Sequence, residues 1–257
     1  MQIPFGEWLP DQPDHLNPGA TVATNVYHAQ SSYKPVKGLV AYSGASNVTQ
    51  NAKGAGSFRD NTNTVFTFVG TKDNIYKLTS GTFASVKGSC TIGGGDTDFF
   101  TFTQFGQYVV ASNGVDAPMY YLMGTSTNFA TLQSLVTSSG SGTVPAKFKV
   151  SGVIRDFFVS ANIENAKNRV AWSGINDLST WEAGVSSSDT QDLPGSGGQV
   201  VAITSGEVGY VFREDQIIRM DFVGGNVVFR FSVISPNRGA VYGQTVCQDN
   251  RQVFFYA

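Results

Sequence analysis

Residues 65–78 read VFTFVGTKDNIYKL and contain two short apolar runs on either side of the polar segment GTKDN. Val, Phe, Tyr and Ile favour β-strands, and Gly, Asp and Asn favour tight turns, so this stretch predicts a strand, a turn and a second strand. The same pattern returns in residues 107–122, 156–172 and 209–220, and it opens once more at residues 252–255.

The spacing of these copies indicates a repeat. Between Phe66, Tyr108, Phe157, Tyr210 and Val253 the intervals are 42, 49, 53 and 43 residues. A period of roughly 40 to 55 residues built of short strands is typical of β-propeller blades. We therefore expect an all-β fold, a β-propeller of short antiparallel blades. An irregular β-sandwich is the alternative, because the same count of strands would fit it.

The repeat predicts about four blades and the start of a fifth. Each blade buries its faces only against its neighbours, so the blades must stack and the ring must close. Residues 252–257 form only half of a hairpin, which would leave an aromatic strand edge open. We therefore expect the chain to be the N-terminal part of a longer protein.

Composition agrees with an all-β fold and argues against several functions. Charged residues make up 14% of the 257 residues, whereas the chain contains 29 Gly and 19 Phe. The net charge is −2, and Lys and Arg form no run. We therefore do not expect the chain to bind nucleic acid through phosphate contacts. We see no signal peptide and no apolar stretch of membrane-spanning length. Cys90 and Cys247 fit no metal-binding spacing and are expected to be small buried residues, although one disulfide remains open.

The first 38 residues follow a different pattern. Residues 1–38 carry five prolines and both histidines and show little periodicity, so we expect an extended N-terminal arm, with the blades in residues 39–257. Phe5 and Trp8 lie among these prolines, where no local strand would bury them. We expect both side chains to anchor on another subunit or domain.

Candidates for chemistry are few. His15 and His28 both lie in the arm, and no His follows in the repeats. Asp96 with Asp98, and Asp189 with Asp192, are the acid clusters that an enzyme would use, but turn formation explains the first pair more simply. We expect no catalytic residue, no metal and no cofactor, and the chain is not expected to be an enzyme.

Four residues are predicted to have structural roles. Asn113 and Gly114 should form a tight hairpin turn, because Asn-Gly readily adopts positive φ angles. Trp172 and Trp181 flank a Gly/Asn/Asp turn and should pack over blade junctions, although exposed indoles would also suit a sugar. Arg238 lies in a loop and could pair with a neighbouring subunit.

Several segments, in this order, resemble the tail hub or nozzle proteins of short-tailed bacteriophages. The segments are residues 4–11 (PFGEWLPD), 17–20 (NPGA), 109–119 (VVASNGVDAPM), 172–181 (WSGINDLSTW), 211–217 (VFREDQI) and 235–240 (SPNRGA). The resemblance implies a structural subunit of the virion tail, made in the host cytoplasm and assembled as a hexameric ring beneath the portal and its adaptor. Such a ring continues the DNA channel without sequence-specific contact, retains the packaged genome and carries tail fibres or spikes. The chain lacks the C-terminal half that family members have.

Two other functions remain open. The chain could be a receptor- or glycan-binding propeller in which Trp172 or Trp181 faces the sugar. It could also be a propeller enzyme, such as a glycoside hydrolase or lyase, whose carboxylates converge at one end of the ring.

Overall fold

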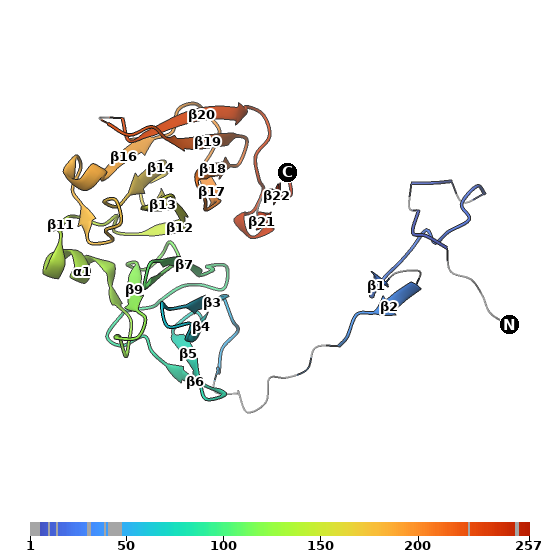
Figure 1. Cartoon of the computed structure of the whole chain (residues 1–257), viewed down its shortest axis with the longest axis horizontal. Coiled ribbons are helices and arrows are strands. Elements are labelled where there is room, and N and C mark those ends of the chain that lie inside the picture. Colours follow the sequence, from blue (N-terminus) through green and yellow to red (C-terminus); the bar gives the residue numbers. More distant parts are fainter. Residues whose placement is uncertain are drawn as a thin grey trace. The chain divides into compact units, whose positions relative to one another are not determined.

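The computed structural model describes residues 6–9, 11–13, 15–29, 32–38, 40, 48–225, 227–249 and 252–257. The chain forms two compact units, Met1–Ser43 and Gly44–Ala257 (Figure 1). Each unit is described by itself.

The N-terminal unit contains local structure that the sequence analysis did not predict. Strands β1 (Val26–Ala29) and β2 (Ser32–Pro35) form an antiparallel hairpin. Trp8 and Ala20 form a parallel bridge, in which the Leu9 N–H donates to the Ala20 carbonyl at 3.0 Å. Pro35 is tolerated in the hairpin because it stands at the end of its strand.

The larger unit consists mainly of four-stranded antiparallel sheets in chain order. The first sheet comprises β3 (Gly54–Arg59), β4 (Val65–Gly70), β5 (Ile75–Thr79) and β6 (Thr82–Ser85). The second comprises β7 (Thr101–Phe105), β8 (Tyr108–Ser112), β9 (Met119–Leu122) and β10 (Ala130–Thr131). The third comprises β12 (Phe148–Ile154), β13 (Phe157–Ile163), β14 (Ala166–Trp172) and β16 (Asp189–Asp192). The fourth comprises β17 (Val200–Ile203), β18 (Val208–Arg213), β19 (Ile217–Phe222) and β20 (Phe229–Ser235).

Smaller elements complete the unit. Strands β21 (Cys247–Asp249) and β22 (Gln252–Phe254) form a two-stranded antiparallel sheet after the fourth sheet. Helix α1 (Leu132–Ser139) leads into β11 (Ser141–Gly142), which pairs in parallel with β15 (Thr180–Trp181). The two short 3-10 helices are η1 (Val185–Ser187) and η2 (Gly243–Thr245).

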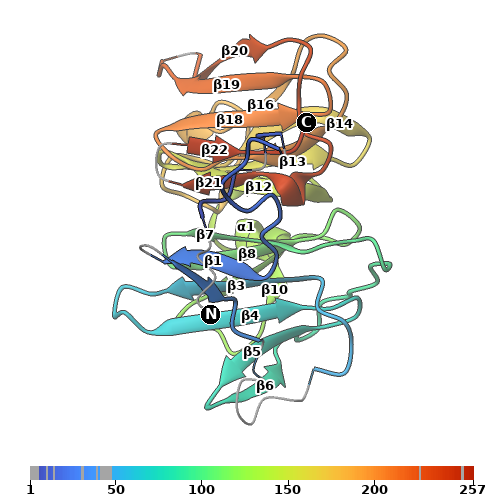
Figure 2. The ribbon, with the colours of Figure 1, turned by 90° about the vertical axis from the view of Figure 1, so that its right-hand side faces the viewer.

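The four sheets are stacked side by side (Figure 2). The first strands of successive sheets contact one another, β3 with β7, β7 with β12, and β12 with β17. Side chains on the two faces of each second strand enter different cores: Val109 packs between the first and second sheets, and Val110 between the second and third. Phe157 and Phe158 divide in the same way between the two sides of the third sheet. Full burial of one such side chain stabilises the fold by about 2 kcal/mol.

This architecture confirms the predicted fold class, an all-β propeller built of short antiparallel blades. The repeated runs in the sequence are the second and third strands of the four sheets. Their marker residues occupy the second strand in every case, and Val253 lies in β22, the second strand of the two-stranded sheet. No helix in the described part of the chain is both long and apolar enough to span a membrane.

Candidate functional site

A cavity of about 930 Å³ lies along the first strands of the sheets. Its wall is formed by the start of β3, the residues leading into β7, the first half of β12, strand β17, and the segment around η2 and β21. Because these segments come from all four four-stranded sheets, we call it the central cavity. Ligand sites in proteins commonly have volumes of roughly 300 to 1,000 Å³, so its size suits a small molecule.

A chain of polar side chains crosses one wall of the central cavity. Asn162 is 4% exposed, and its Nδ2 donates to the Val200 carbonyl at 2.7 Å and to the Gln199 Oε1 at 3.3 Å. The Gln199 side chain in turn donates to the Glu214 carboxylate at 2.8 Å. Asn162 has a φ of 55° at a break in the β13–β14 register, a conformation that Asn tolerates better than most residues. Within the described residues, the Asn162 Oδ1 accepts no hydrogen bond.

Lys149 lies beside Asn162 on the same wall. The register of β12 and β13 pairs Phe148 with Ile163 and Val150 with Ala161, which sets Lys149 opposite Asn162. Lys149 is half-buried and lines the central cavity, and its Nζ forms no ion pair or hydrogen bond with the described residues. The side chain of Lys149 begins beside Gly114 in the β8–β9 loop, whereas the side-chain amide of Asn162 bonds to Val200 and Gln199.

A second lysine of the cavity is already engaged. The Nζ of Lys53 donates to the Asp96 carbonyl and lies 3.7 Å from the Asp96 carboxylate. The same Nζ is 5.9 Å from the centre of the Phe99 ring, which is 40% exposed. Tyr242, 65% exposed, also lines the cavity. The cavity thus combines two aromatic rings with polar side chains.

The first pair of candidate acids takes part in loop contacts. Asp96 forms the ion pair with Lys53 just described, and Asp98 accepts a hydrogen bond from the Gly95 N–H at 2.7 Å. Neither Asp lines the central cavity. These contacts are those of a turn that precedes Phe99 and strand β7.

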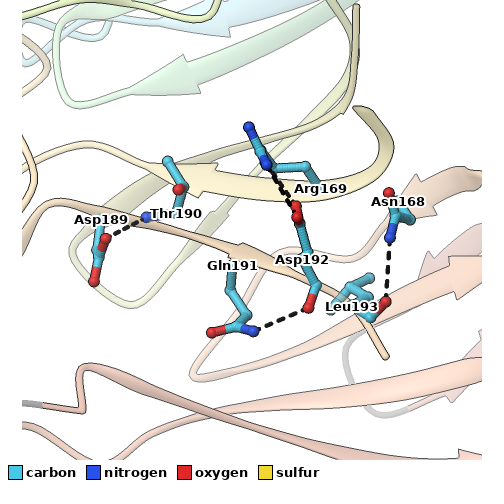
Figure 3. Close-up of polar contacts among 7 residues, drawn as sticks. All are labelled: Asn168, Arg169, Asp189, Thr190, Gln191, Asp192 and Leu193. Carbon is cyan, nitrogen blue, oxygen red and sulfur yellow. Dashed lines mark hydrogen bonds and ion pairs between the residues drawn. The ribbon is translucent and has the colours of Figure 1, made fainter. Parts of the chain in front are cut away.

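The second pair of acids lies at the two ends of β16, as Figure 3 shows. Asp192 receives two hydrogen bonds from the Arg169 guanidinium, at 2.6 and 2.9 Å. The hydrogen bonds and charge of Arg169 lower the pKa of Asp192 below its ordinary value. Asp189 accepts from the Thr190 N–H at 2.8 Å. Residues three apart in a strand point to opposite faces, so these two carboxylates do not converge.

The two indoles of residues 172–181 are buried. Trp172 is 4% exposed and packs between the third and fourth sheets, whereas Trp181 is 8% exposed and packs between the second and third. Their Nε1 atoms donate to the Ser187 and Leu178 carbonyls, both at 2.8 Å. Neither indole therefore presents a free face to a sugar.

The Asn113 loop is longer than the predicted tight hairpin turn. The Asn113 Oδ1 accepts from the N–H groups of Val115 and Asp116, and Gly114 has a φ of 79°. Asp116 accepts from the Asn113 Nδ2 at 2.7 Å and from the Gly93 N–H, at 3.1 and 3.2 Å to its two oxygens. The loop therefore links β8 and β9 to the glycine-rich segment that precedes β7.

Sequence analysis missed the role of Arg213. This side chain is 2% exposed, and its guanidinium donates to the carbonyls of Pro194, Gly195 and Gly198 and to the Gln216 Oε1 at 2.7 to 3.2 Å. The Arg213 carbonyl accepts from the Ala240 N–H at 3.0 Å. A Cβ on Gly239 would overlap the carbonyl oxygens of Arg213 and Glu214. Two segments that carry the family resemblance, residues 211–217 and 235–240, therefore pack together.

The residues suggested for subunit contacts are exposed where they are described. Trp8 is 56% exposed, with its Nε1 donating to the Thr21 carbonyl at 3.3 Å. Arg238 is exposed and forms no ion pair with the described residues, and Phe5 lies outside them. Cys90 and Cys247 do not pair: Cys90 is buried and Cys247 is exposed, contrary to the expectation that both are buried. His15 is exposed in the N-terminal unit, and the side chain of His28 lies outside the described residues.

Comparison with known proteins gives likeness only to solved structures. No family model matches the chain, and no curated protein matches it. The chain is similar to a chain in the crystal structure of the mitotic checkpoint complex, with 9% identity and a TM-score of 0.46, covering 76% of this chain and 55% of that one. It is similar to BBS1N in complex with ARL6DN, with 12% identity and a TM-score of 0.40 over 76% of this chain and 59% of that one. It is also similar to YCF48 from Cyanidioschyzon merolae, with 12% identity and a TM-score of 0.38 over 65% and 55%.

Proposed function

We propose that the chain is a non-catalytic structural subunit that assembles with its own copies into a ring, of the tail hub or nozzle kind found in short-tailed bacteriophages. In that role the ring, a hexamer, continues the DNA channel beneath the portal and adaptor, retains the packaged genome and carries fibres or spikes. The subunit is made in the host cytoplasm and acts in the virion.

The observation that best supports the proposal is the separate N-terminal unit with its exposed Trp8. A large indole that stays more than half exposed within its own unit is well suited to bury itself on another subunit, where Trp is among the strongest interface residues. The sequence resemblance adds support, because its segments keep the same order along most of the chain. The turn contacts of Asp96 and Asp98 and the cross-strand ion pair between Asp192 and Arg169 favour a structural role for these acids.

Native mass spectrometry of the purified chain tests the proposal. We expect a closed homo-oligomer of six copies, with Trp8→Ala shifting the distribution towards monomers. His15→Ala is the matched control, because His15 is also exposed in the N-terminal unit. A chain that stays monomeric at micromolar concentration contradicts the ring.

The central cavity favours a second candidate function, a ligand-binding propeller. It has the volume of a ligand site and is lined by polar side chains and by the exposed rings of Phe99 and Tyr242. Screening the purified chain on a glycan array that contains neutral and acidic saccharides tests this function. Binding to no member of the array would argue against it.

A further inference from the structure

We propose that copies of the chain join head to tail, with the loop around Trp8 in one copy docking on the outer edge of the fourth sheet in the next. The inference rests on the ring proposed above and assigns the two surfaces that form its subunit interface. We call residues 6–20 the acidic loop and residues 229–242 the edge patch.

Strand β20, which begins the edge patch, is a long and open sheet edge. It is the outermost strand of the fourth sheet and pairs only with β19 (Figure 2). It has seven residues, whereas the fourth strands of the other three sheets have four or fewer. Its Val233 and Ile234 are 45% and 52% exposed. Proteins usually shorten, charge or cover such an edge, because its free backbone groups pair readily with another chain. The edge patch therefore has the properties of a contact surface.

The turn after β20 places a free cation beside this edge. The Ser235 Oγ donates to the Arg238 carbonyl at 2.9 Å, and a Cβ on Gly239 would overlap carbonyl oxygens at the end of β18, so the turn packs closely on the fourth sheet. The Arg238 side chain is exposed and forms no ion pair with the described residues. Val241 and Tyr242, which follow, are exposed as well. The edge patch thus combines a guanidinium with apolar side chains.

The acidic loop presents Trp8 on a backbone that hydrogen bonds close. The Ala20 N–H donates to the Glu7 carbonyl at 2.8 Å, and the Leu9 N–H donates to the Ala20 carbonyl at 3.0 Å. The Asn17 side chain donates to the Leu9 carbonyl at 2.7 Å. Trp8 lies at this closure and stays more than half exposed. The indole is therefore held in position before it meets a partner, which lowers the entropy lost on binding.

The two surfaces are complementary in charge. Residues 6–20 contain three acids and no Lys or Arg, whereas residues 229–242 contain two Arg and no acid. Glu7 and Asp11 are exposed, and their carboxylates form no ion pair with the described residues. Each copy carries one surface of each kind, so contacts between different surfaces repeat from copy to copy and can close into a ring. A second copy of this chain is therefore the partner that fits the edge patch.

Ile234→Ser tests the apolar half of this interface in the full chain. Native mass spectrometry and sedimentation should show a dissociation constant of the oligomer that is about tenfold or more higher, because the interface loses a large apolar side chain. Ile175→Ser is the matched control, because Ile175 is 43% exposed and lies outside the edge patch. It should assemble like the parent chain. Unchanged circular dichroism of Ile234→Ser shows that its fold is intact.

Charge reversal tests the pairing of the two surfaces. Glu7→Lys/Asp11→Lys and Arg238→Glu should each weaken assembly by about tenfold or more, because like charges then face each other across the interface. An equimolar mixture of these two variants should assemble again, since a ring of six can alternate them so that opposite charges meet at every contact. Glu182→Lys, at an exposed position outside both surfaces, is the control and should assemble normally.

The remaining outcomes separate this inference from the ring itself. If the parent chain forms a hexamer that Ile234→Ser and both charge variants leave unchanged, the inference is overturned while the ring stands. A mixture of the charge variants that stays dissociated also overturns the head-to-tail contact. A parent chain that is monomeric at micromolar concentration overturns both the ring and the inference.

Discussion

Arg213 is a fully buried cation whose described hydrogen bonds all go to uncharged oxygens. Three of its four hydrogen-bond acceptors are carbonyls of residues 194–198, the loop between the third and fourth sheets. Burial lowers the pKa of Arg213, while the nearby Glu214 acts in the opposite direction. An arginine can still remain charged here because its intrinsic pKa is so high. The planar guanidinium therefore fixes a loop that has no regular secondary structure.

We expect Arg213→Ala to lower the free energy of unfolding by about 3 kcal/mol or more, because three loop carbonyls lose their donor in a buried site. Arg213→Lys should recover only part of this loss, because one ammonium group cannot reach acceptors spread over the guanidinium plane. Urea unfolding followed by tryptophan fluorescence measures both variants. Arg238→Ala, at an exposed position, is the control and should leave the unfolding midpoint unchanged. Equal stability of Arg213→Ala and the parent chain would contradict the role given to Arg213.

Asp177 makes a pH-dependent contribution to the stability of the fold. Burial raises its pKa, but hydrogen bonds from Ser179 and Thr180 outweigh burial, and the net pKa lies below the ordinary value of 3.8. Because the pKa of Asp177 is lower in the folded than in the unfolded protein, the ionised carboxylate stabilises the fold at pH values above the pKa of the unfolded state. This contribution is lost as the pH falls through the pKa of the folded state. Asp177→Asn should therefore cost about 1 kcal/mol at neutral pH, and the difference should shrink below about pH 4. Chemical unfolding at a series of pH values measures this difference in the free energy of unfolding. The variant Asp215→Asn, at an exposed position, is the control.

The two cysteines should differ in reactivity. Cys247 is exposed, whereas Cys90 is buried and burial raises the pKa of its thiol. Labelling with a disulfide reagent in native buffer should modify one thiol per chain quickly and the second only after unfolding. Cys247→Ser should abolish the fast phase, and Cys90→Ser should leave it intact. Two fast phases in the parent chain would show that the core between the first and second sheets, which contains Cys90, opens readily in solution.

Among the elements, the second strands were the clearest in the sequence because they are mostly buried on both faces. Strand β13 is buried at all seven positions, and β4, β8 and β18 are mostly buried, so their apolar runs stand out. Some first and fourth strands were missed because they are short or mix polar with apolar residues, as in GAGSFR of β3 and DTQD of β16. The apolar β17 (VVAI) and β20 (FRFSVIS) were missed because the repeat was aligned on the second and third strands alone.

Helix α1 was missed for another reason. Its sequence LQSLVTSS contains four Ser and Thr residues, and Thr131 at its N-cap makes no capping hydrogen bond from its side chain. Such a helix is weak in isolation and depends on tertiary packing, here on the buried Leu132, Leu135 and Val136. The central cavity was equally unpredictable, because its lining residues are spread from Ala52 to Gln248 and only the arrangement of the sheets brings them together.

This view of α1 predicts opposite effects at two of its positions. Leu132→Ala should destabilise the protein by about 2 to 5 kcal/mol, because it empties a fully buried site. The exposed Thr137→Ala should stabilise it by a few tenths of a kcal/mol, because Ala has the higher helix propensity. Thermal unfolding measures both. A large loss of stability at Thr137 would indicate an undetected tertiary role for its hydroxyl, which donates to the Gln133 carbonyl at 2.9 Å.

For the whole molecule, the division into two units predicts that the blades fold alone. Removing residues 1–43 deletes one compact unit and leaves the four sheets and their cores intact. The truncated chain should keep the circular dichroism spectrum of a β protein and a melting temperature within a few degrees of the parent. It should lose oligomers if the N-terminal unit joins subunits, since one buried Trp commonly contributes about 2 kcal/mol. Unchanged assembly after truncation would mean that Trp8 joins nothing.

The strands of each of the four sheets follow one another in the chain, interrupted only by β15 in the third sheet, and this order has a consequence for synthesis. The strands of one sheet leave the ribosome together, and each sheet finds its main packing partner in the sheet made just before it. Pairing between neighbours in sequence costs little loop-closure entropy and can proceed while translation continues at roughly 5 to 20 residues per second. The sheets of the nascent protein can therefore fold one after another, starting from the N-terminal end. The sheet made most recently always has one apolar face that no later sheet covers yet. A chaperone or a second nascent copy would bind the chain at that face.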